Sequence, residues 1–121
     1  MYRGYCGAME LTDKQVEIIQ EWAATTRYVR EVRLFGSRAK ASPKPTSDVD
    51  LAITVDGNNA GTILGNWYVE GKRWQPQLTT LLGFKAHLDL YNDPDGDKVR
   101  RYCDEYSVLL FPLKRTSLQR G

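Results

Sequence analysis

The stretch LFGSRAKASPKPTSDVDLAI, residues 34–53, joins an apolar segment that ends in Gly36 and Ser37 to a second one that begins with Asp48 and Asp50. Two prolines in the intervening loop prevent regular structure there, because proline lacks a backbone donor and has a fixed φ. Successive side chains of a strand point to opposite faces. We therefore expect Asp48 and Asp50 to lie together on one face, while the alternate apolar residues face the core.

Patterns on both sides of this stretch predict alternating helices and strands. Thr12 and Gln15 form a capping box at the start of a helix that reaches about residue 25. Strands are expected at 28–35, 48–55, 85–92 and 107–113, a helix at 98–106, and one broken helix or two short ones at 62–82, interrupted at Gly71 and Pro76. The expected fold class is α+β: a two-layer domain with a small mixed sheet of about four strands and helices packed on one face.

Length and composition indicate one small domain. The chain has 121 residues and a formal net charge of +2, without the blocks of lysine and arginine typical of nucleic-acid binders. We expect a disordered tail at 1–8, a folded domain at 9–113 and a basic tail at 114–121. No targeting or membrane-spanning pattern is present, which predicts a cytoplasmic protein. Cys6 and Cys103 are too far apart, and too isolated from histidines, to indicate a disulfide framework or a zinc site.

A third carboxylate is expected to join the aspartate pair. In the third predicted strand, His87 and Asp89 lie on the face opposite the apolar residues, so Asp89 would meet Asp48 and Asp50 if the second and third strands are neighbours. Carboxylates this close repel unless a divalent cation neutralises them, and their hard oxygens suit Mg²⁺ or Mn²⁺. Asp56 lies too far along its strand to contribute and is interpreted as a turn residue. His87 is interpreted as a structural hydrogen-bonding residue and is left outside the catalytic set.

The Gly-Ser pair has the chemistry of a phosphate-binding turn. Gly36 allows the backbone to approach a ligand, and the amides that follow, together with the Ser37 hydroxyl, can donate to phosphate oxygens at the start of a helix. Arg38 is within reach to add positive charge. The chain contains no GxxxxGK[ST] motif, so this is not a P-loop.

The segment GSRAKASPKPTSDVDLAI resembles the signature of the DNA polymerase beta-like nucleotidyltransferase superfamily, in its minimal nucleotidyltransferase branch. The resemblance extends to the preceding strand EVRLF, the aspartate of HLDLY and the closing segment VRRYCDEYSVLLF. One departure is Ala41, where relatives often have glycine.

The resemblance implies a role for each motif residue. Gly36 and Ser37 would hold the triphosphate, Asp48 and Asp50 would bind two Mg²⁺ or Mn²⁺ ions, and Asp89 would be a third ligand that activates the acceptor hydroxyl. Two metal ions can neutralise both the attacking and the leaving oxygen, which is the main requirement of nucleotidyl transfer. The expected reaction moves AMP from ATP to a hydroxyl acceptor and releases pyrophosphate.

The acceptor is expected to come from another chain. The resemblance implies a small helical partner of the HEPN type, with this chain as the antitoxin of a toxin–antitoxin pair. The alternatives are self-association, a non-catalytic nucleotide-binding antitoxin or regulatory subunit, and an aminoglycoside-type small-molecule adenylyltransferase that works as a dimer. Residues 62–82, with Trp67, Tyr68 and Trp74, are the first candidate for an exposed apolar partner surface, although tryptophans are core residues by default.

Overall fold

The computed structural model describes residues 11–35 and 49–112, so the expected tails at 1–8 and 114–121 lie outside the described residues. The order of elements in the described ranges is the one expected from the sequence. It runs α1 (Asp13–Thr25), β1 (Val29–Phe35), β2 (Val49–Val55), α2 (Ala60–Leu82), β3 (Ala86–Leu90), α3 (Lys98–Glu105) and β4 (Val108–Phe111). None of these helices is long and apolar enough to cross a membrane.

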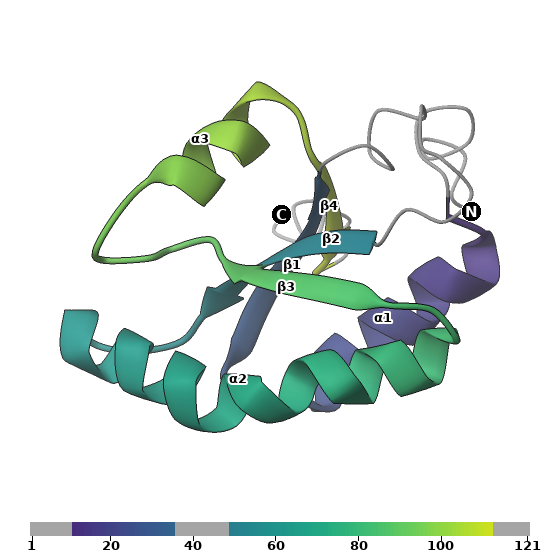
Figure 1. Ribbon diagram of the computed structural model, residues 1–121, viewed down its shortest axis with the longest axis horizontal. Coiled ribbons are helices and arrows are strands. Elements are labelled where there is room, and N and C mark those ends of the chain that lie inside the picture. The colour runs from purple at the N-terminus through teal and green to yellow at the C-terminus, as the bar shows by residue number, and fades with distance from the viewer. Residues whose placement is uncertain (1–10, 36–48, 113–121) are drawn as a thin grey trace, which may run out of the picture.

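The strands form one mixed sheet in the order β3-β2-β1-β4. β1 pairs antiparallel with β2 and with β4, whereas β2 and β3 are parallel. A parallel pair needs a crossover, and α2 supplies it between β2 and β3 (Figure 1). The expected mixed α+β sheet of four strands is therefore confirmed.

α1 and α2 cover one face of the sheet (Figure 1). The expected capping box begins α1, where Thr12 Oγ1 accepts from the Gln15 backbone and the Gln15 side chain accepts from the Thr12 backbone. Trp22 of α1 and Trp74 of α2 meet edge to face, with ring centroids 6.1 Å apart. The core beneath them contains apolar residues from both helices and all four strands, among them Val16, Ile19, Val32, Leu34, Leu51, Ile53, Leu78, Leu88 and Leu110.

α2 is one continuous helix, so the expected break within 62–82 was wrong. Pro76 is exposed, and water can there satisfy the carbonyl that loses its helical partner. Gly71 lies against the ring of Trp67, where a Cβ atom would approach a ring carbon to 3.2 Å. Buried Trp74 and Leu78 flank the proline along the helix and hold both halves on the sheet. Packing therefore overrides the local helix-breaking tendency.

α3 lies on the opposite face of the sheet, whereas the sequence placed the helices on one face (Figure 1). Its buried Cys103 packs against Phe35 of β1 and Ala52 of β2. The small side chain of Ala52 leaves room for this helix. The second face of the sheet is therefore partly covered, and that cover lies next to the residues with candidate chemistry.

Side chains of α1 and α2 form hydrogen bonds with backbone groups of the two edge strands, β4 and β3. Along β3, the Ala86 amide donates to Thr79 Oγ1 at 3.1 Å and the Leu88 amide donates to Gln75 Oε1 at 3.0 Å. Along β4, Gln20 Nε2 donates to the Leu110 carbonyl at 2.9 Å. These two amides of β3 and this carbonyl of β4 are therefore not open to pairing with an added strand.

Candidate active site

Asp50 lies on the face of β2 that points away from α1 and α2. Its neighbours Val49 and Leu51 are buried in the core, whereas Asp50 is half-buried. The register pairs Asp50 with Phe35 at the end of β1. Asp50 therefore lies beside the last residue of β1. Gly36, the next residue in the chain, lies outside the described residues.

Asp89 lies on the same face, one strand away. β2 and β3 are neighbours, as the sequence analysis required, and Asp89 is half-buried between the core residues Leu88 and Leu90. The register pairs Asp89 with Ala52, so Asp89 is diagonal to Asp50 rather than directly beside it. Diagonal neighbours on one face are about 7–8 Å apart at Cα, which is close enough for both carboxylates to reach a common ligand.

The side chain directly beside Asp50 on β3 is His87, which is exposed. Sequence alternation placed His87 on this face, but it did not give the register that makes it the neighbour of Asp50. The interpretation of His87 as a mainly structural residue rested on its being a lone histidine. In the structure, His87 lies on the aspartate face as the register partner of Asp50.

The donor set fits a divalent cation in its chemistry, since Asp50 and Asp89 present carboxylate oxygens on one face. Within residues 11–35 and 49–112, no group of three or more histidine, cysteine, aspartate or glutamate side chains could hold a metal ion. Asp48, the third expected ligand, lies outside the described residues, as do the expected nucleotide-binding residues Gly36, Ser37 and Arg38. The structure thus places two of the three expected carboxylates on one face, and the roles of the other residues stay predictions.

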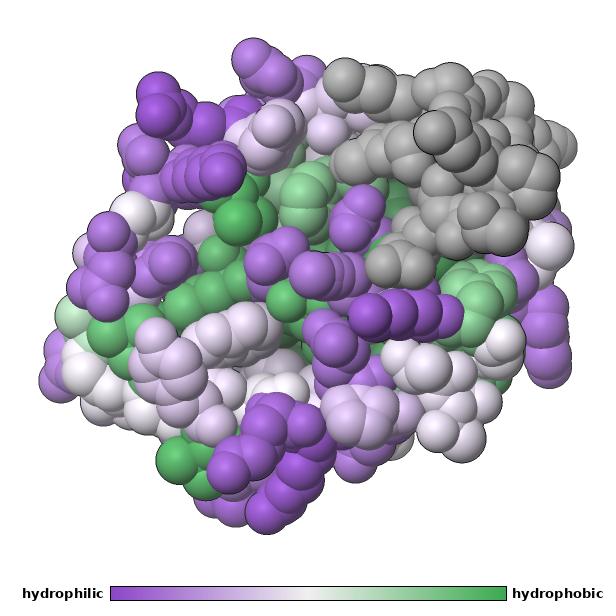
Figure 2. Space-filling view, viewed as in Figure 1, coloured by the Kyte–Doolittle hydropathy of each residue, from purple (hydrophilic) through white to green (hydrophobic). Residues whose placement is uncertain are grey.

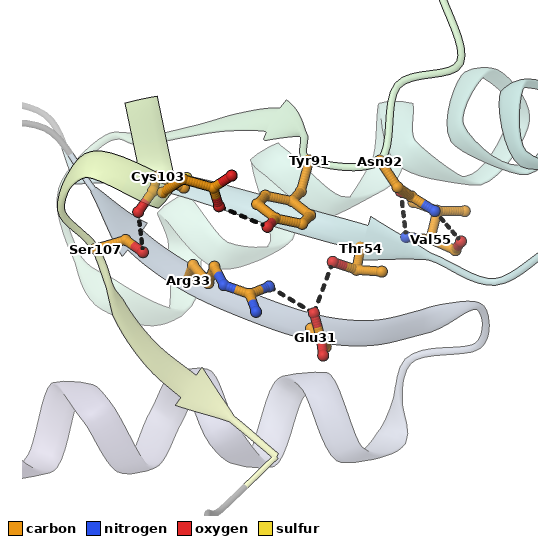
Figure 3. A network of polar contacts seen from close by, with 9 residues as sticks. Glu31, Arg33, Thr54, Val55, Tyr91, Asn92, Cys103 and Ser107 are labelled. Carbon is orange, nitrogen blue, oxygen red and sulfur yellow. Dashed lines mark hydrogen bonds and ion pairs between the residues drawn. The ribbon is translucent and has the colours of Figure 1, made fainter. Parts of the chain in front are cut away.

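A network of polar contacts lies on the same face, toward the C-terminal end of β2, whereas Asp50 is near its start (Figure 3). Glu31 accepts from both Arg33 and Thr54, and the Arg33 guanidinium lies 4.4 Å from the centroid of the Tyr91 ring. The Tyr91 hydroxyl donates to Asp104 at 3.1 Å. Burial raises the pKa of Tyr91, and the hydrogen bond to Asp104 acts in the same direction. The network joins β1, β2, α3 and the residue that follows β3, on the sheet face that carries the aspartates.

The buried side chain of Cys103 packs α3 against this face of the sheet. Burial raises the pKa of its thiol to about 11, while the Arg33 guanidinium opposes the shift and the carboxylates of Asp104 and Asp89 add to it. A buried thiol that stays protonated is a packing group rather than a nucleophile. Cys103 packs against Ala52, and the register pairs Ala52 with Asp89, so α3 borders the candidate site.

Asn92 extends the sheet beyond the end of β3. Its side-chain oxygen accepts from the Val55 amide at 3.0 Å, and its side-chain nitrogen donates to the Val55 carbonyl at 2.9 Å (Figure 3). Asp56, which follows Val55, is exposed and pairs with Arg30 at 3.3 Å. Asp56 therefore lies just past the end of β2, at the far end from Asp50, as the interpretation required; it forms an ion pair there, and no turn is assigned at this residue.

A small mixed sheet that carries aspartates on adjacent strands of one face defines an α+β domain of the nucleotidyltransferase fold class. The family model for Polymerase beta, Nucleotidyltransferase matches residues 17–100. The chain therefore belongs to this family, which supports nucleotidyl transfer as its general activity. A search of curated proteins gave no match to the chain.

Proposed function

We propose that the protein is a metal-dependent nucleotidyltransferase that moves AMP from ATP to a hydroxyl acceptor and releases pyrophosphate. The observation that carries the proposal is the placement of Asp50 and Asp89 on one face of adjacent parallel strands, in a chain of the polymerase beta nucleotidyltransferase family. Carboxylates in this arrangement suit Mg²⁺, which supplies charge neutralisation for the triphosphate when it is bound.

Each residue of the proposed site has one task. Asp48 and Asp50 hold the cation and Asp89 is the third ligand. Gly36 and Ser37, with Arg38 in support, hold the phosphates that leave. The acceptor oxygen bonds to the α-phosphorus as the bond from that phosphorus to the bridging oxygen of pyrophosphate breaks. Asp89 takes the hydroxyl proton, because the attacking oxygen must lose it as the new bond forms.

For the acceptor, we propose a protein partner that docks on α2. Tyr68 is 65% exposed and its neighbour Val69 is 58% exposed, so two successive large side chains of α2 reach the surface. Beside them is a hollow of about 360 Å³ between α2 and the edge of β3, lined by Trp67, Tyr68, Gly71, Lys72, Gln75, Pro76 and Leu88. On this side of the molecule, apolar and weakly polar surface lies among hydrophilic side chains (Figure 2).

The three aromatic residues expected at this surface differ in their burial. Trp74 is 2% exposed and is a core residue, so it does not belong to the docking surface. Trp67 is half-buried and contacts Trp74 at 6.1 Å between ring centroids, which leaves part of its ring for a partner. Because Gln75 already occupies the β3 edge, a helical partner that packs against α2 fits this surface better than an added strand. A helical protein of the HEPN type, in a toxin–antitoxin pair, is the partner we propose.

The nucleotide site is tested by thermal melts with Mg²⁺ alone, ATP alone, and both together. If the cation joins the aspartates to the triphosphate, the two ligands together raise Tm by more than the sum of their separate shifts, since binding to the native state stabilises by mass action. Additive or absent shifts contradict the proposal. Repeating the melt with GTP, CTP and UTP establishes the choice of base.

The partner surface is tested with the protein encoded by the neighbouring gene. Tyr68→Ser should weaken its binding, whereas Tyr102→Ser, at a similarly exposed tyrosine on α3, should not. Release of pyrophosphate in the presence of that partner supports transfer to a protein. Tight binding of the partner without pyrophosphate release favours the alternative of a nucleotide-binding antitoxin that acts by covering its partner.

A further inference from the structure

A polar hollow lies on the helical side of the molecule, between the end of α1 and the middle of α2. Its volume is about 380 Å³, which is within the range of small-molecule sites. It is lined by the last residues of α1, by Arg27 in the turn that follows, and by one side of α2. The hollow proposed for the partner lies instead between α2 and β3, so the two are separate.

Two guanidinium groups from different parts of the chain line this hollow. Arg27 lies in the turn between α1 and β1, with its guanidinium carbon 5.0 Å from the centroid of the Tyr28 ring. Among the described residues, no carboxylate pairs with Arg27. Arg73 of α2 pairs with Glu70 at 3.3 Å through one nitrogen of a guanidinium that has five N–H donors. Most donors of both arginines are therefore available to a ligand.

Two neutral donors belong to the same hollow. The indole N–H of Trp22, which can only donate, bonds to Gln77 Oε1 at 3.0 Å. This bond fixes the orientation of the Gln77 amide and leaves its NH₂ group for another acceptor. Trp74 is 2% exposed, and its indole N–H has no hydrogen-bond acceptor in the part of the chain that the structure describes. Buried donors normally have partners, and a ligand in the hollow can supply one.

The negative groups beside the hollow already have partners. Carbonyl groups at the end of a helix oppose the binding of an anion. At the end of α1, the Trp22 carbonyl accepts from the hydroxyls of Thr25 and Thr26. The carboxylate of Glu70 is paired with Arg73. Two guanidinium groups against one carboxylate leave the lining with an excess of positive charge.

We propose that this hollow binds a phosphoryl group, carried by a small phosphate ester or by inorganic phosphate. Guanidinium groups match phosphoryl oxygens in both geometry and charge. The four donor groups come from α2 and from the turn after α1, so they approach a ligand from different directions. A phosphoryl group has three terminal oxygens that accept hydrogen bonds, whereas a carboxylate has only two, which lie in one plane. The arrangement therefore favours a phosphoryl group over a carboxylate.

This site is separate from the proposed nucleotide site. Asp50 lies on the face of β2 that points away from α1 and α2, whereas the hollow lies among those two helices (Figure 1). Binding in the hollow therefore needs neither the aspartates nor a metal ion. Protein freed of metal ions can be used to measure it.

The first measurement is a titration of metal-free protein with inorganic phosphate, followed by ¹H–¹⁵N NMR. We expect saturable shifts of the indole N–H signal of Trp74 and of the side-chain NH₂ signals of Gln77. AMP should give the same shifts, whereas adenosine, which lacks the phosphoryl group, should not. Tighter binding of AMP than of phosphate identifies an ester as the ligand, and equal or weaker binding identifies free phosphate.

Three results of this titration overturn the proposal. They are the absence of a saturable shift at either residue, a shift with adenosine equal to that with AMP, and binding of succinate as tight as that of phosphate. Succinate carries two negative charges on carboxylates, so it tests whether the hollow selects the phosphoryl group or responds to charge alone.

Variants give a second measurement. Arg27→Gln and Arg73→Gln should each weaken phosphate binding about tenfold, the scale of one charge-assisted hydrogen bond. Glu70→Gln should tighten binding, because it removes the carboxylate that competes for Arg73. Arg30→Gln is the matched control: Arg30 does not line the hollow, and its side chain is 64% exposed against 65% for Arg73.

The variants separate a built site from a diffuse effect of charge. A loss for Arg30→Gln equal to that for Arg73→Gln contradicts the proposal, as does unchanged or weaker binding in Glu70→Gln. Arg27, Arg30 and Arg73 are all exposed, so their replacement should leave the melting temperature without ligand close to that of the wild type.

Discussion

The two faces of the sheet use the same strands for different purposes. The face toward α1 and α2 carries a continuous apolar core, to which β2 contributes Leu51 and Ile53. The opposite face of the same strand carries Asp50, Ala52 and Thr54, and α3 covers only its middle. The apolar face binds the helices through buried area, which requires no specific partner atoms. The polar face instead presents individual groups with defined neighbours.

This difference separates stability from chemistry within one strand. The buried face can hold Asp50 in place because its neighbours along the chain, Val49 and Leu51, are fully buried. The polar face can then carry charges that contribute little to folding. Substitutions on the two faces should therefore have different signatures: loss of stability on one, and loss of ligand response on the other.

The largest stability effect is expected on the helical face. Leu51→Ala removes a fully buried side chain, and we expect it to lower the free energy of unfolding by about 3 kcal/mol. Thr54→Ala, on the other face of the same strand, loses one hydrogen bond to Glu31 and should cost about 1 kcal/mol or less. Urea unfolding of both variants measures the two values. Similar losses would mean that the two faces do not differ as described.

The next effect concerns ligand response. Asp50→Asn removes one charge from the proposed cation site, so protein in chelator should melt at an unchanged or higher temperature, because the mutual repulsion of the carboxylates falls. Its stabilisation by Mg²⁺ and ATP, about 2.7 kcal/mol at one hundred times Kd in the wild type, should disappear. Asp56→Asn should retain the full ligand shift. If Asp50→Asn is destabilised in chelator and keeps that shift, Asp50 is a structural residue.

A smaller effect on stability should appear at alkaline pH. It comes from Cys103, at the contact between α3 and the polar face. The pKa of Cys103 is raised by burial from 9.0 to about 11, so the folded protein keeps the proton that the unfolded chain loses. The resulting stability is fully present below pH 9 and is lost as the pH rises through about 11, by up to about 2 kcal/mol.

The measurement is urea unfolding of the wild type and of Cys103→Ala between pH 8 and pH 11. Because alanine has no proton to lose, the stability difference between the two proteins should shrink across this range. Comparison with the variant also removes the contribution of Tyr91, whose pKa is raised in both proteins as long as its burial and its bond to Asp104 persist. A constant difference across the range would show that the thiol is less buried than described.

Local patterns predicted the order of elements and the face on which Asp50, His87 and Asp89 lie. The reason is that a strand repeats every two residues, so alternation assigns faces without knowledge of the neighbouring strand. The capping box at Thr12 was equally local, since its hydrogen bonds join residues three apart. The assignments of Gly36, Ser37, Arg38 and Asp48 came from motif and resemblance, and they stay predictions.

The tertiary structure decided three features that no local pattern contains. The register of β2 and β3 made His87, rather than Asp89, the direct neighbour of Asp50, because register depends on how the α2 crossover docks. The packing of Trp74 and Leu78 kept α2 continuous through Pro76, against its local preference. Contact between Cys103 and Ala52 placed α3 on the aspartate face. The sequence by itself determined the face on which Asp50, His87 and Asp89 lie, and long-range packing determined which of them are neighbours.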